Sequence, residues 1–355
     1  MKSTVGIFFF RPSLGGGTTT FTAHLFKALE AAGERPMIYK VRPRGEDFTR
    51  PFGKYDGVVY RNITKGLAER IVKDRPTIMA APAPDKYLVE PGLIQHLMTL
   101  GMRIVIHDPN EFQIFNHLTT RDNRKELRVV KLPGGRHPIC IRPTMQQFYK
   151  KAVFIPHPYM RALGSVNVGG PPSWDNRKNA VSIARIASVK RPKIILDAAR
   201  LIKKKSLRVL LMGAEYRMYT RTLAEKYPDV FQQSGKTFQF PMTFQAPVEL
   251  AGKYRFNVDM TWFPDDGGGT QYAQMEAMDA GTINIMHHDW FRYGGEVVPG
   301  KHVLTVKGPK DLARILSNWN EYKHQAFDIR MAGYKLLKHH HPEIIGKTYM
   351  QELNK

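Results

Sequence analysis

The chain has 355 residues, of which 42% are hydrophobic and 11% aromatic, so it is long and apolar enough for two folded domains and is not intrinsically disordered. Its 54 Lys and Arg residues against 31 Asp and Glu give a net charge of +23, which predicts attraction to a polyanion, either nucleic acid or an anionic membrane surface. The single cysteine, Cys140, excludes an internal disulfide, and we expect it to be a small buried hydrophobe.

The first apolar run covers residues 5–10 and ends at Arg11. It is too short for the apolar region of a signal peptide, so it predicts a first buried strand. No later stretch approaches the length that a helix needs to span a bilayer. We therefore expect a cytoplasmic protein.

Residues 1–165 alternate between strand and helix signals. Helical patterns fall at residues 21–29, 63–73 and 93–100, and apolar strand-like runs fall at residues 5–10, 37–41, 57–60, 77–81 and 103–106. Short apolar strands that alternate with helices predict an α/β fold with a parallel, doubly wound sheet. In such sheets ligands bind beyond the carboxyl ends of the strands.

A second alternating series follows a stretch without periodicity. Residues 166–178, which include two glycines followed by two prolines, are predicted to be an interdomain linker. The second domain is predicted over residues 179–325, with strands at 180–184, 208–212 and 303–306 and helices at 192–202 and from Lys310. Residues 326–355 are predicted to be C-terminal helices. One option is that these helices cross back and pack on the first domain, residues 1–165.

Residues 258–286 form the stretch around which the second domain is organised. They show a strand up to Pro264, the turn Gly267-Gly268-Gly269-Thr270, a helix to Ala280 and a second strand. Three consecutive glycines let the backbone turn tightly, so that the N–H groups at the helix start face a ligand, where the helix dipole favours phosphate. The alternative is an ordinary glycine-rich turn.

Two further features belong to this prediction. The tetrapeptide Gly-Gly-Gly-Thr also occurs at residues 15–18, which makes Gly16 and Gly17 candidates for binding the same ligand. Glu276 lies about one and a half turns into the later helix, where it can reach past the phosphates toward ribose hydroxyls. The alternative for Glu276 is a solvated carboxylate on a helix.

Two cations follow the first strand of the second domain. Arg185 comes directly after that strand, and Lys190 follows five residues later. Opposite a phosphate-binding helix terminus, they would neutralise a diphosphate leaving group through charge-assisted hydrogen bonds. The alternative is two more positive residues in a basic protein.

The second half of the chain resembles the donor-binding half of retaining glycosyltransferases with the GT-B architecture, in which two Rossmann-like, doubly wound domains face a central cleft. The resemblance rests on residues in the same order along the chain: Arg185, Lys190, the glycine turn, Glu276 and Gly281-Thr282. It implies that the Arg and the Lys hold the diphosphate of a nucleotide sugar and that the carboxylate on the helix binds the ribose.

The chain departs from this family at one position. The usual pattern has a second Glu eight residues upstream of Glu276, where this chain has Gly268. Asp265 and Asp266 are candidate substitutes for holding the hydroxyl groups of the sugar.

More specifically, the chain is similar to the bacteriophage DNA α-glucosyltransferases, which add glucose to hydroxymethylcytosine in DNA. The similarity extends from residues 15–21 to the last helix, with sparse identity between the motifs. Residues 103–106 form an apolar strand that ends in His107-Asp108. This strand resembles the apolar strand ending in His-Asp that lies at the acceptor side of that family. The resemblance implies that Asp108 assists the acceptor hydroxyl and that His107 contacts the sugar near its anomeric carbon.

The residues themselves agree with this role for His107 and Asp108. The carboxyl end of a strand in a parallel sheet presents its side chains to the cleft, and a carboxylate there can accept the proton of an attacking hydroxyl. The alternative is that the pair is a structural cap of the strand.

A DNA acceptor accounts for the uneven charge. From Leu127 to Trp174 the sequence contains no Asp or Glu, and basic residues recur in and before this stretch. Phosphate contacts would offset the cost of flipping the modified nucleotide into an active site. The candidates for DNA contacts are Arg121, Arg124, Arg128, Lys131, Arg136 and Arg142.

No metal site is expected. The run His339-His340-His341 is not a convincing metal site, because three consecutive residues of a helix point in different directions. We expect no tightly bound cofactor, only a nucleotide sugar such as UDP-glucose as co-substrate.

The leading hypothesis is a retaining, phage-type DNA glycosyltransferase that moves a sugar from a UDP-sugar to a hydroxymethylpyrimidine, with hydroxymethylcytosine as the first choice, in duplex DNA. The second hypothesis keeps the GT-B enzyme but changes the acceptor to a glycan, a lipid-linked glycan or a small molecule, with the basic surface meeting an anionic membrane. The third is a non-catalytic DNA-binding protein. The sequence makes no prediction about the oligomeric state.

Overall fold

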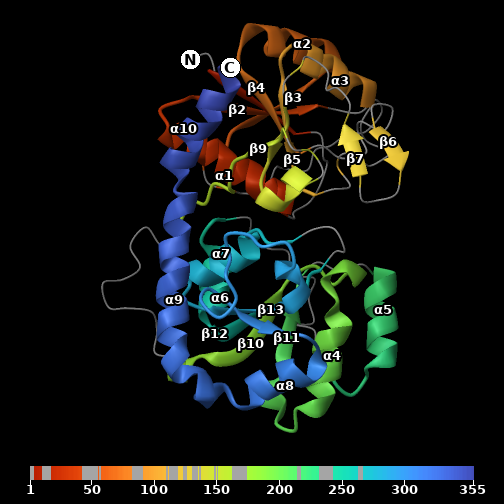
Figure 1. Ribbon diagram of the computed structural model, residues 1–355, viewed down its shortest axis with the longest axis vertical. Coiled ribbons are helices and arrows are strands. Elements are labelled where there is room, and N and C mark those ends of the chain that lie inside the picture. The colour runs from red at the N-terminus through yellow and green to blue at the C-terminus, as the bar shows by residue number, and fades with distance from the viewer. Residues whose placement is uncertain are drawn as a thin grey trace. The chain divides into compact units, whose positions relative to one another are not determined.

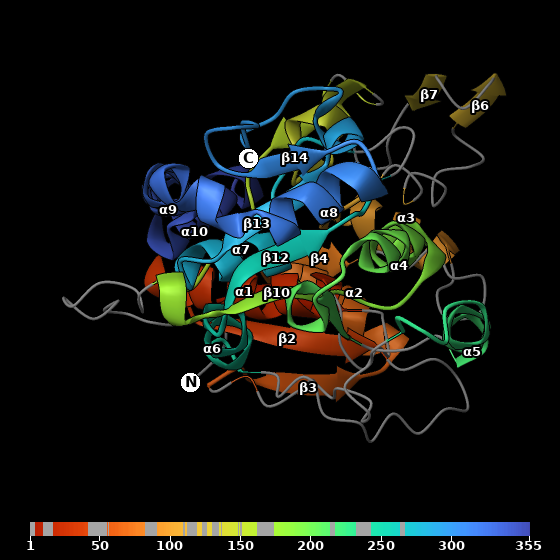
Figure 2. The same ribbon diagram turned by 90° about the horizontal axis from the view of Figure 1, so that it is seen from below.

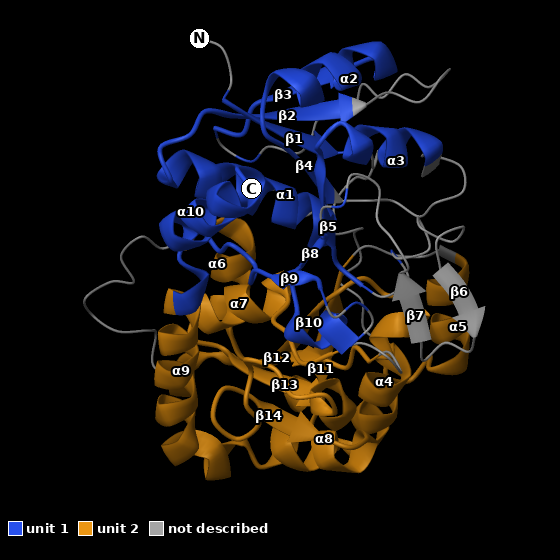
Figure 3. Ribbon diagram, turned by 45° about the horizontal axis from the view of Figure 1, so that its top comes forward, with its two compact units in different colours: residues 1–160, 339–355 blue, residues 161–338 orange. Residues whose placement is uncertain are grey.

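The computed structural model of the chain divides into two compact units, which Figure 3 shows in different colours. Unit 1 contains residues 1–160 and 339–355, and unit 2 contains residues 161–338. The structure describes residues 4–9, 17–41, 55, 57–81, 91–108, 111, 119–122, 126–129, 135, 137–147, 149, 151–161, 174–213, 217–231, 243–262 and 267–355.

Unit 1 is built on a parallel sheet of seven strands in the order β3-β2-β1-β4-β5-β8-β9. The strands are β1 Val5–Phe9, β2 Pro36–Val41, β3 Tyr60–Ile63, β4 Thr77–Ala81, β5 Arg103–Ile106, β8 Ile139–Cys140 and β9 Val153–Phe154. The helices are α1 Gly17–Ala31, α2 Lys65–Asp74, α3 Pro91–Thr99, the 3-10 helix η3 Pro143–Gln147 and, from the end of the chain, α10 Pro342–Leu353. The inner strands β1 and β5 are buried along their whole length, as expected for a parallel sheet covered on both faces.

The C-terminal helix α10 packs against α1, and the two lie side by side in Figure 1. The backbones approach so closely that a Cβ at Gly346 would lie 2.0 Å from the carbonyl oxygen of Ala28. Near the end of α10, Glu352 pairs with the guanidinium of Arg103 at 2.8 Å, and both side chains are largely buried. A glycine and a buried ion pair therefore fix the last helix to the sheet of unit 1.

Two features of unit 1 concern residues singled out above. Strands β6 Thr119–Asp122 and β7 Glu126–Val129 form a separate antiparallel pair that the sequence analysis did not predict. Cys140 is fully buried, and burial raises the pKa of its thiol to about 12. The prediction of a small buried hydrophobe at this position is confirmed.

Unit 2 is built on a parallel sheet of five strands in the order β11-β10-β12-β13-β14. The strands are β10 Lys178–Ile183, β11 Val209–Met212, β12 Tyr254–Asp259, β13 Ile283–His287 and β14 Leu304–Val306. The α-helices are α4 Pro192–Leu201, α5 Arg217–Lys226, α6 Ala246–Gly252, α7 Tyr272–Asp279, α8 Pro309–Ser317 and α9 Lys323–Leu337. The 3-10 helices are η4 Trp174–Asn176, η5 Ser188–Lys190, η6 Lys205–Leu207, η7 His288–Phe291, η8 Trp319–Tyr322 and η9 Lys338–His340, the last of which begins in unit 2 and ends in unit 1.

Alternate residues of β10 enter different cores. Ala180 packs into the core that contains α4 and α8, which lie side by side in Figure 2, whereas Val181 and Ile183 pack into the core that contains α6 and α7. This alternation follows the period of two in a strand, and it means that helices cover both faces of the sheet. The predicted α/β class with two doubly wound parallel sheets is confirmed.

The element predictions needed three corrections. The strand predicted to run to Pro264 ends at Asp259, because the Asp259 carboxylate accepts hydrogen bonds from the N–H and the hydroxyl of Thr261 and turns the chain there. The strand predicted at residues 57–60 lies at Tyr60–Ile63. The end of the predicted linker is folded, since Trp174 is buried against Phe256 with ring centroids 5.3 Å apart.

Among the described helices, none combines the length and the apolar character that a bilayer crossing requires.

Candidate functional site

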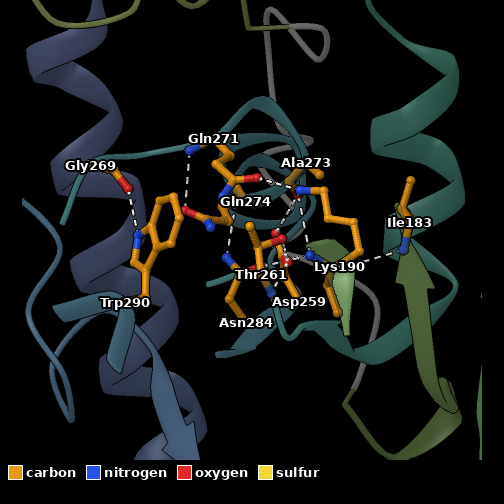
Figure 4. A network of polar contacts seen from close by, with 11 residues as sticks. Ile183, Lys190, Asp259, Thr261, Gly269, Gln271, Ala273, Gln274, Asn284 and Trp290 are labelled. Atoms are coloured by element: carbon orange, nitrogen blue, oxygen red, sulfur yellow. Dashed lines mark hydrogen bonds and ion pairs between the residues drawn. The ribbon is translucent and has the colours of Figure 1, made fainter. Parts of the chain in front are cut away.

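The strands β10, β12 and β13 of unit 2 end at one edge of the sheet, and polar side chains gather there. Because the strands are parallel, the residues that follow Ile183, Asp259 and His287 emerge at the same carboxyl edge. Figure 4 shows the network of polar contacts at this edge. The glycine turn and the start of α7, both of which the sequence analysis singled out, belong to it.

Lys190 lies at the centre of this network. Its Nζ atom donates a hydrogen bond of 2.9 Å to Oε1 of Gln271, the residue that caps the N-terminus of α7, and lies 3.9 Å from Oδ2 of Asp259. Asp259 is almost fully buried. A cation at a helix N-terminus is unfavourable with the helix dipole, so a bound anion would stabilise both the ammonium group and the helix end.

Arg185, the other predicted cation, follows β10 at the same edge of the sheet. It is exposed. Its place at a strand end is the one that the sequence analysis assigned to it. The structure thus brings Arg185 and Lys190 to the edge that also carries the glycine turn.

The glycine turn is fixed by its backbone. Gly267 and Gly268 have φ angles of 153° and 74°, and a Cβ at Gly267 would lie 2.2 Å from the carbonyl oxygen of Trp290. The N–H of Gly268 donates to that same oxygen at 2.6 Å, and the indole N–H of Trp290 donates to the carbonyl of Gly269 at 3.0 Å. These positions require glycine, because other residues rarely adopt positive φ and a side chain has no room.

The last residue of the turn holds a carboxylate that the sequence analysis missed. Both the N–H and the hydroxyl of Thr270 donate to Oε1 of Glu296, at 3.2 and 2.9 Å. Gly294 and Gly295, with φ angles of 73° and 138°, precede Glu296. This second glycine pair was the signal in the sequence that another segment approaches the turn.

Two buried asparagines in neighbouring strands hold the start of α7. Asn284 in β13 donates to the carbonyl oxygen of Gln274 at 2.9 Å, and Asn257 in β12 donates to Oδ1 of Asn284 at 2.8 Å. Gln271 and Gln274 form a reciprocal capping box. Polar residues inside apolar strand patterns were the signal for this role, which the sequence analysis did not use.

Glu276 lies in the second turn of α7 with 8% of its surface exposed. No group in the parts of the chain that the structure describes is hydrogen-bonded to its carboxyl. Burial, with a smaller contribution from Asp279, raises its pKa to about 8. Asp279 itself pairs with Arg161 at 2.8 Å. Without a ligand, the Glu276 carboxyl therefore carries a proton at neutral pH, and it is ready to accept hydroxyl donors once ionised.

The predicted acceptor residues lie at the carboxyl end of β5 in unit 1. His107 is 7% exposed, its Nε2 atom lies 2.6 Å from the carbonyl oxygen of Ala80, and its backbone N–H donates to the carboxylate of Glu111 at 2.6 Å. The ring of Phe21 packs edge-on against the imidazole at 4.6 Å. His107 is therefore held by its surroundings, and the half-buried Asp108 follows it at the same edge.

Glu111 is a second residue that the sequence analysis missed. Only 1% of its surface is exposed, and its N–H donates to the carbonyl oxygen of Asp108 at 3.1 Å. A buried carboxylate four residues after His107 closes the turn after β5. Its spacing from His107 was the available signal.

Three further buried histidines, His24, His157 and His340, lie in unit 1, and His157 lies within electrostatic range of the other two and of His107. Burial lowers the pKa of His24 to about 3, and burial together with the charges of Arg142 and the neighbouring histidines lowers the pKa of His157. His340 Nδ1 lies 2.7 Å from the carbonyl oxygen of His157. The imidazoles of His24 and His157 are therefore neutral at neutral pH.

The remaining predicted residues are spread over unit 1. Gly17 is the first residue of α1, Arg121 and Arg128 lie on the backbones of β6 and β7, and Arg142 is half-buried before η3. Gly16, Asp265, Asp266, Arg124, Lys131 and Arg136 lie outside the described residues. Within the described ranges, no three His, Cys, Asp or Glu side chains are grouped as metal ligands.

No protein-family model matches the sequence, and neither does the sequence of any curated protein. Solved structures do match over the whole chain. The Anabaena protein HepE in complex with UDP and glucose is 11% identical, with 99% of this chain and 100% of that chain covered and a TM-score of 0.67. An α-glucosyltransferase in complex with UDP and a 13-mer DNA containing an HMU base is 12% identical, with full coverage of both chains and a TM-score of 0.67.

A glycosyltransferase from Rickettsia africae is 14% identical, with 99% of this chain and 98% of that chain covered and a TM-score of 0.66. At such low identity the likeness establishes the fold alone. The chain has the GT-B fold, as the sequence analysis predicted.

Proposed function

We propose that the chain is a retaining glycosyltransferase that transfers a sugar from a UDP-sugar to the hydroxymethyl group of a 5-hydroxymethylpyrimidine, hydroxymethylcytosine in the first place, in duplex DNA. One arrangement carries this proposal. A cation held at a helix N-terminus, a fixed glycine turn and a buried carboxyl without a hydrogen bond from a described residue lie at one edge of the unit 2 sheet.

The donor half of the reaction falls to unit 2. Lys190 and Arg185 would neutralise the diphosphate, and the start of α7 would bind it at the helix terminus. The turn from Gly267 to Thr270 would bind the donor beside the diphosphate. The Glu276 carboxylate would accept hydrogen bonds from the two ribose hydroxyls, which replace the water that burial has removed. Gly16 and Gly17, which belong to the second Gly-Gly-Gly-Thr tetrapeptide, would also bind the donor.

The acceptor half falls to unit 1. The hydroxymethyl oxygen would attack the anomeric carbon from the face that the diphosphate leaves, which retains the configuration, while the bond from that carbon to the diphosphate breaks and UDP leaves with the bonding electrons. Asp108 would accept the proton that the hydroxymethyl group loses, and His107 would contact the sugar near the anomeric carbon. The buried surroundings of His107 keep this strand end in one conformation.

The net charge of +23 and the acid-free stretch between residues 127 and 174 support a DNA acceptor. The candidates for phosphate contacts are Arg121, Arg124, Arg128, Lys131, Arg136 and Arg142. An α-glucosyltransferase bound to UDP and DNA shares the fold over the full length of both chains. The hydroxymethyl group lies in the major groove, and enclosing it in an active site would involve flipping its nucleotide, which costs a few kcal/mol that phosphate contacts can offset.

Another acceptor class is the alternative, because HepE, described with UDP and glucose, matches the fold with the same TM-score. In that case the acceptor is a glycan, a lipid-linked glycan or a small molecule, and the basic surface meets an anionic membrane. Salt-sensitive binding to duplex DNA without binding to anionic vesicles would favour DNA.

The experiment is nucleoside mass spectrometry after incubation of the protein with a panel of UDP-sugars and duplex DNA that is hydroxymethylated, already glucosylated or unmodified. We expect a mass gain of one hexose or pentose on a hydroxymethylpyrimidine. Hydrolysis of a UDP-sugar without a mass gain on any DNA would contradict the assignment of DNA as the acceptor and would support the assignment of a UDP-sugar as the donor. No hydrolysis and no transfer would contradict both.

A further inference from the structure

The carboxylate of Glu296 is held at the glycine turn by a residue distant in the sequence. Its Oε1 atom accepts hydrogen bonds from the N–H of Thr270 at 3.2 Å and from the hydroxyl of Thr270 at 2.9 Å. Thr270 is fully buried, so both donors have a fixed position. Two donors from one immobile residue orient the carboxylate, which makes it a pre-formed part of the turn.

The backbone before Glu296 places this carboxylate next to the glycine turn. Gly295 has a φ angle of 138°, and a Cβ at this position would lie 1.5 Å from the carbonyl oxygen of Gly268. Gly268 in turn has a φ angle of 74°. The two glycines therefore meet backbone to backbone, and the acidic side chain comes from the residue after Gly295 rather than from the turn.

A carboxylate at this position has a defined chemistry. The residue after Thr270 is Gln271, which holds the ammonium of Lys190, so neighbouring residues of the chain fix one anion and one cation at the turn. A diphosphate on the Lys190 side would be repelled by the Glu296 carboxylate rather than bound by it. An ionised carboxylate can only accept hydrogen bonds, and the hydroxyl groups of a ligand can donate them.

We infer that Glu296 accepts a hydrogen bond from a hydroxyl of the sugar of the donor, and thereby distinguishes a nucleotide sugar from the free nucleotide. The inference rests on the proposed function, because the sugar is the group next to the diphosphate in a UDP-sugar. Thr270 is then a positioning residue, which acts through the carboxylate that it holds. Gly268 leaves the turn without an acidic side chain at that position, and Glu296 supplies one.

The test compares two ligands on one variant. The dissociation constants of UDP and of the UDP-sugar that the wild type binds best, chosen from UDP-glucose, UDP-galactose and UDP-N-acetylglucosamine, are measured by calorimetry. Glu296→Gln keeps an oxygen that can accept from Thr270 but removes the charge. Glu321→Gln, an exposed carboxylate on η8, is the matched control.

We expect Glu296→Gln to bind UDP as the wild type does and to bind the UDP-sugar about tenfold more weakly, because a neutral amide oxygen accepts a weaker hydrogen bond than a carboxylate does. Thr270→Val should likewise raise the dissociation constant of the UDP-sugar, and the control Glu321→Gln should change neither dissociation constant. Retained UDP binding shows that the variant is folded.

Four results would overturn the inference. Equal weakening of both ligands would make Glu296 a structural residue of the turn, and tighter binding of both would mean that the carboxylate competes with the phosphates. Unchanged binding of the UDP-sugar would leave Glu296 without a role in recognition, while the proposed function stands. If the wild type binds no UDP-sugar, the proposed function fails together with the inference.

Discussion

Lys190 and Gln271 are joined by a hydrogen bond of 2.9 Å between the ammonium and the side-chain oxygen that caps α7. The bond places a positive charge at the positive end of a helix, with the carboxylate of Asp259 3.9 Å away as partial compensation. An anion bound at this point would relieve the unfavourable interaction.

Removing the cation should weaken both binding and turnover. We expect Lys190→Ala to lower the turnover number by about 100-fold or more, as the loss of one donor to a developing charge does in other enzymes. Steady-state kinetics with a UDP-sugar measure the effect. Lys193→Ala, which changes an exposed lysine on α4, should behave as the wild type. Equal losses in the two variants would mean that net charge, rather than this site, is responsible.

The raised pKa of Glu276 predicts a pH-dependent affinity for UDP. The ligand-free carboxyl holds its proton up to a pKa of about 8, whereas ribose hydroxyls donate to the ionised form. The affinity for UDP should therefore rise with pH between about 6 and 8. Because binding releases one proton, the affinity should rise by at most tenfold per pH unit. Titration calorimetry across this range measures it. A wild-type affinity that does not vary with pH would contradict the assigned role, and Glu276→Gln should abolish the dependence.

The same carboxyl predicts a stability effect of defined sign. Unfolding releases the carboxyl into water with a lower pKa, so the unfolded state loses its proton first and the folded state loses stability as pH rises from about 4.5 to about 8. Glu276→Gln should raise the melting temperature more at pH 8.5 than at pH 5. A shift of equal size at both values would show that Glu276 is not protonated in the folded protein.

Asp108 is predicted to act on the acceptor alone. Asp108→Asn should lower transfer to hydroxymethylated DNA by about 100-fold or more, within the range of contributions from general bases, while the dissociation constants of UDP and DNA stay unchanged. Transfer kinetics, calorimetry and a DNA-binding assay measure the three quantities. Weaker binding of UDP in proportion to lost turnover would place Asp108 in the donor site instead.

Substitution of a glycine at the contact between α1 and α10 should have the opposite effect to substitution of a glycine in open space. Gly346→Ala would bring a Cβ within 2.0 Å of the Ala28 carbonyl oxygen, so we expect it to destabilise the protein by about 1–3 kcal/mol. Gly66→Ala, on α2 with no described atom within 4 Å of its Cβ, should stabilise it by about 0.5–1 kcal/mol. Chemical denaturation measures both. Similar effects at the two positions would contradict the close approach.

The sequence predicted most of the fold because its signals are local. Apolar runs of a few residues marked the strands, and the glycine turn marked the start of α7. The strand ending at Asp259 was placed too far along, because Met260 and Trp262 continue the apolar pattern after the Asp259 side chain has turned the chain.

The candidate site was predicted only in part. Lys190, Gly267 and Glu276 stand next to local signals, a strand end or a glycine turn. Glu296 was missed because its partner, Thr270, lies 26 residues away, and Asn257 was missed because its partner lies in the next strand. Such contacts depend on how segments pack, which no local pattern encodes.

The central claim is sugar transfer to DNA with a donor held at Lys190 and an acceptor activated at Asp108. The most direct test is the intact mass of a duplex oligonucleotide with one hydroxymethylcytosine, after incubation with a UDP-sugar and the wild type, Lys190→Ala or Asp108→Asn in parallel. We predict that the wild type adds the mass of one sugar and that both variants leave the oligonucleotide almost unmodified. An unmodified oligonucleotide with the wild type across all UDP-sugars, or full modification by both variants, would contradict the account.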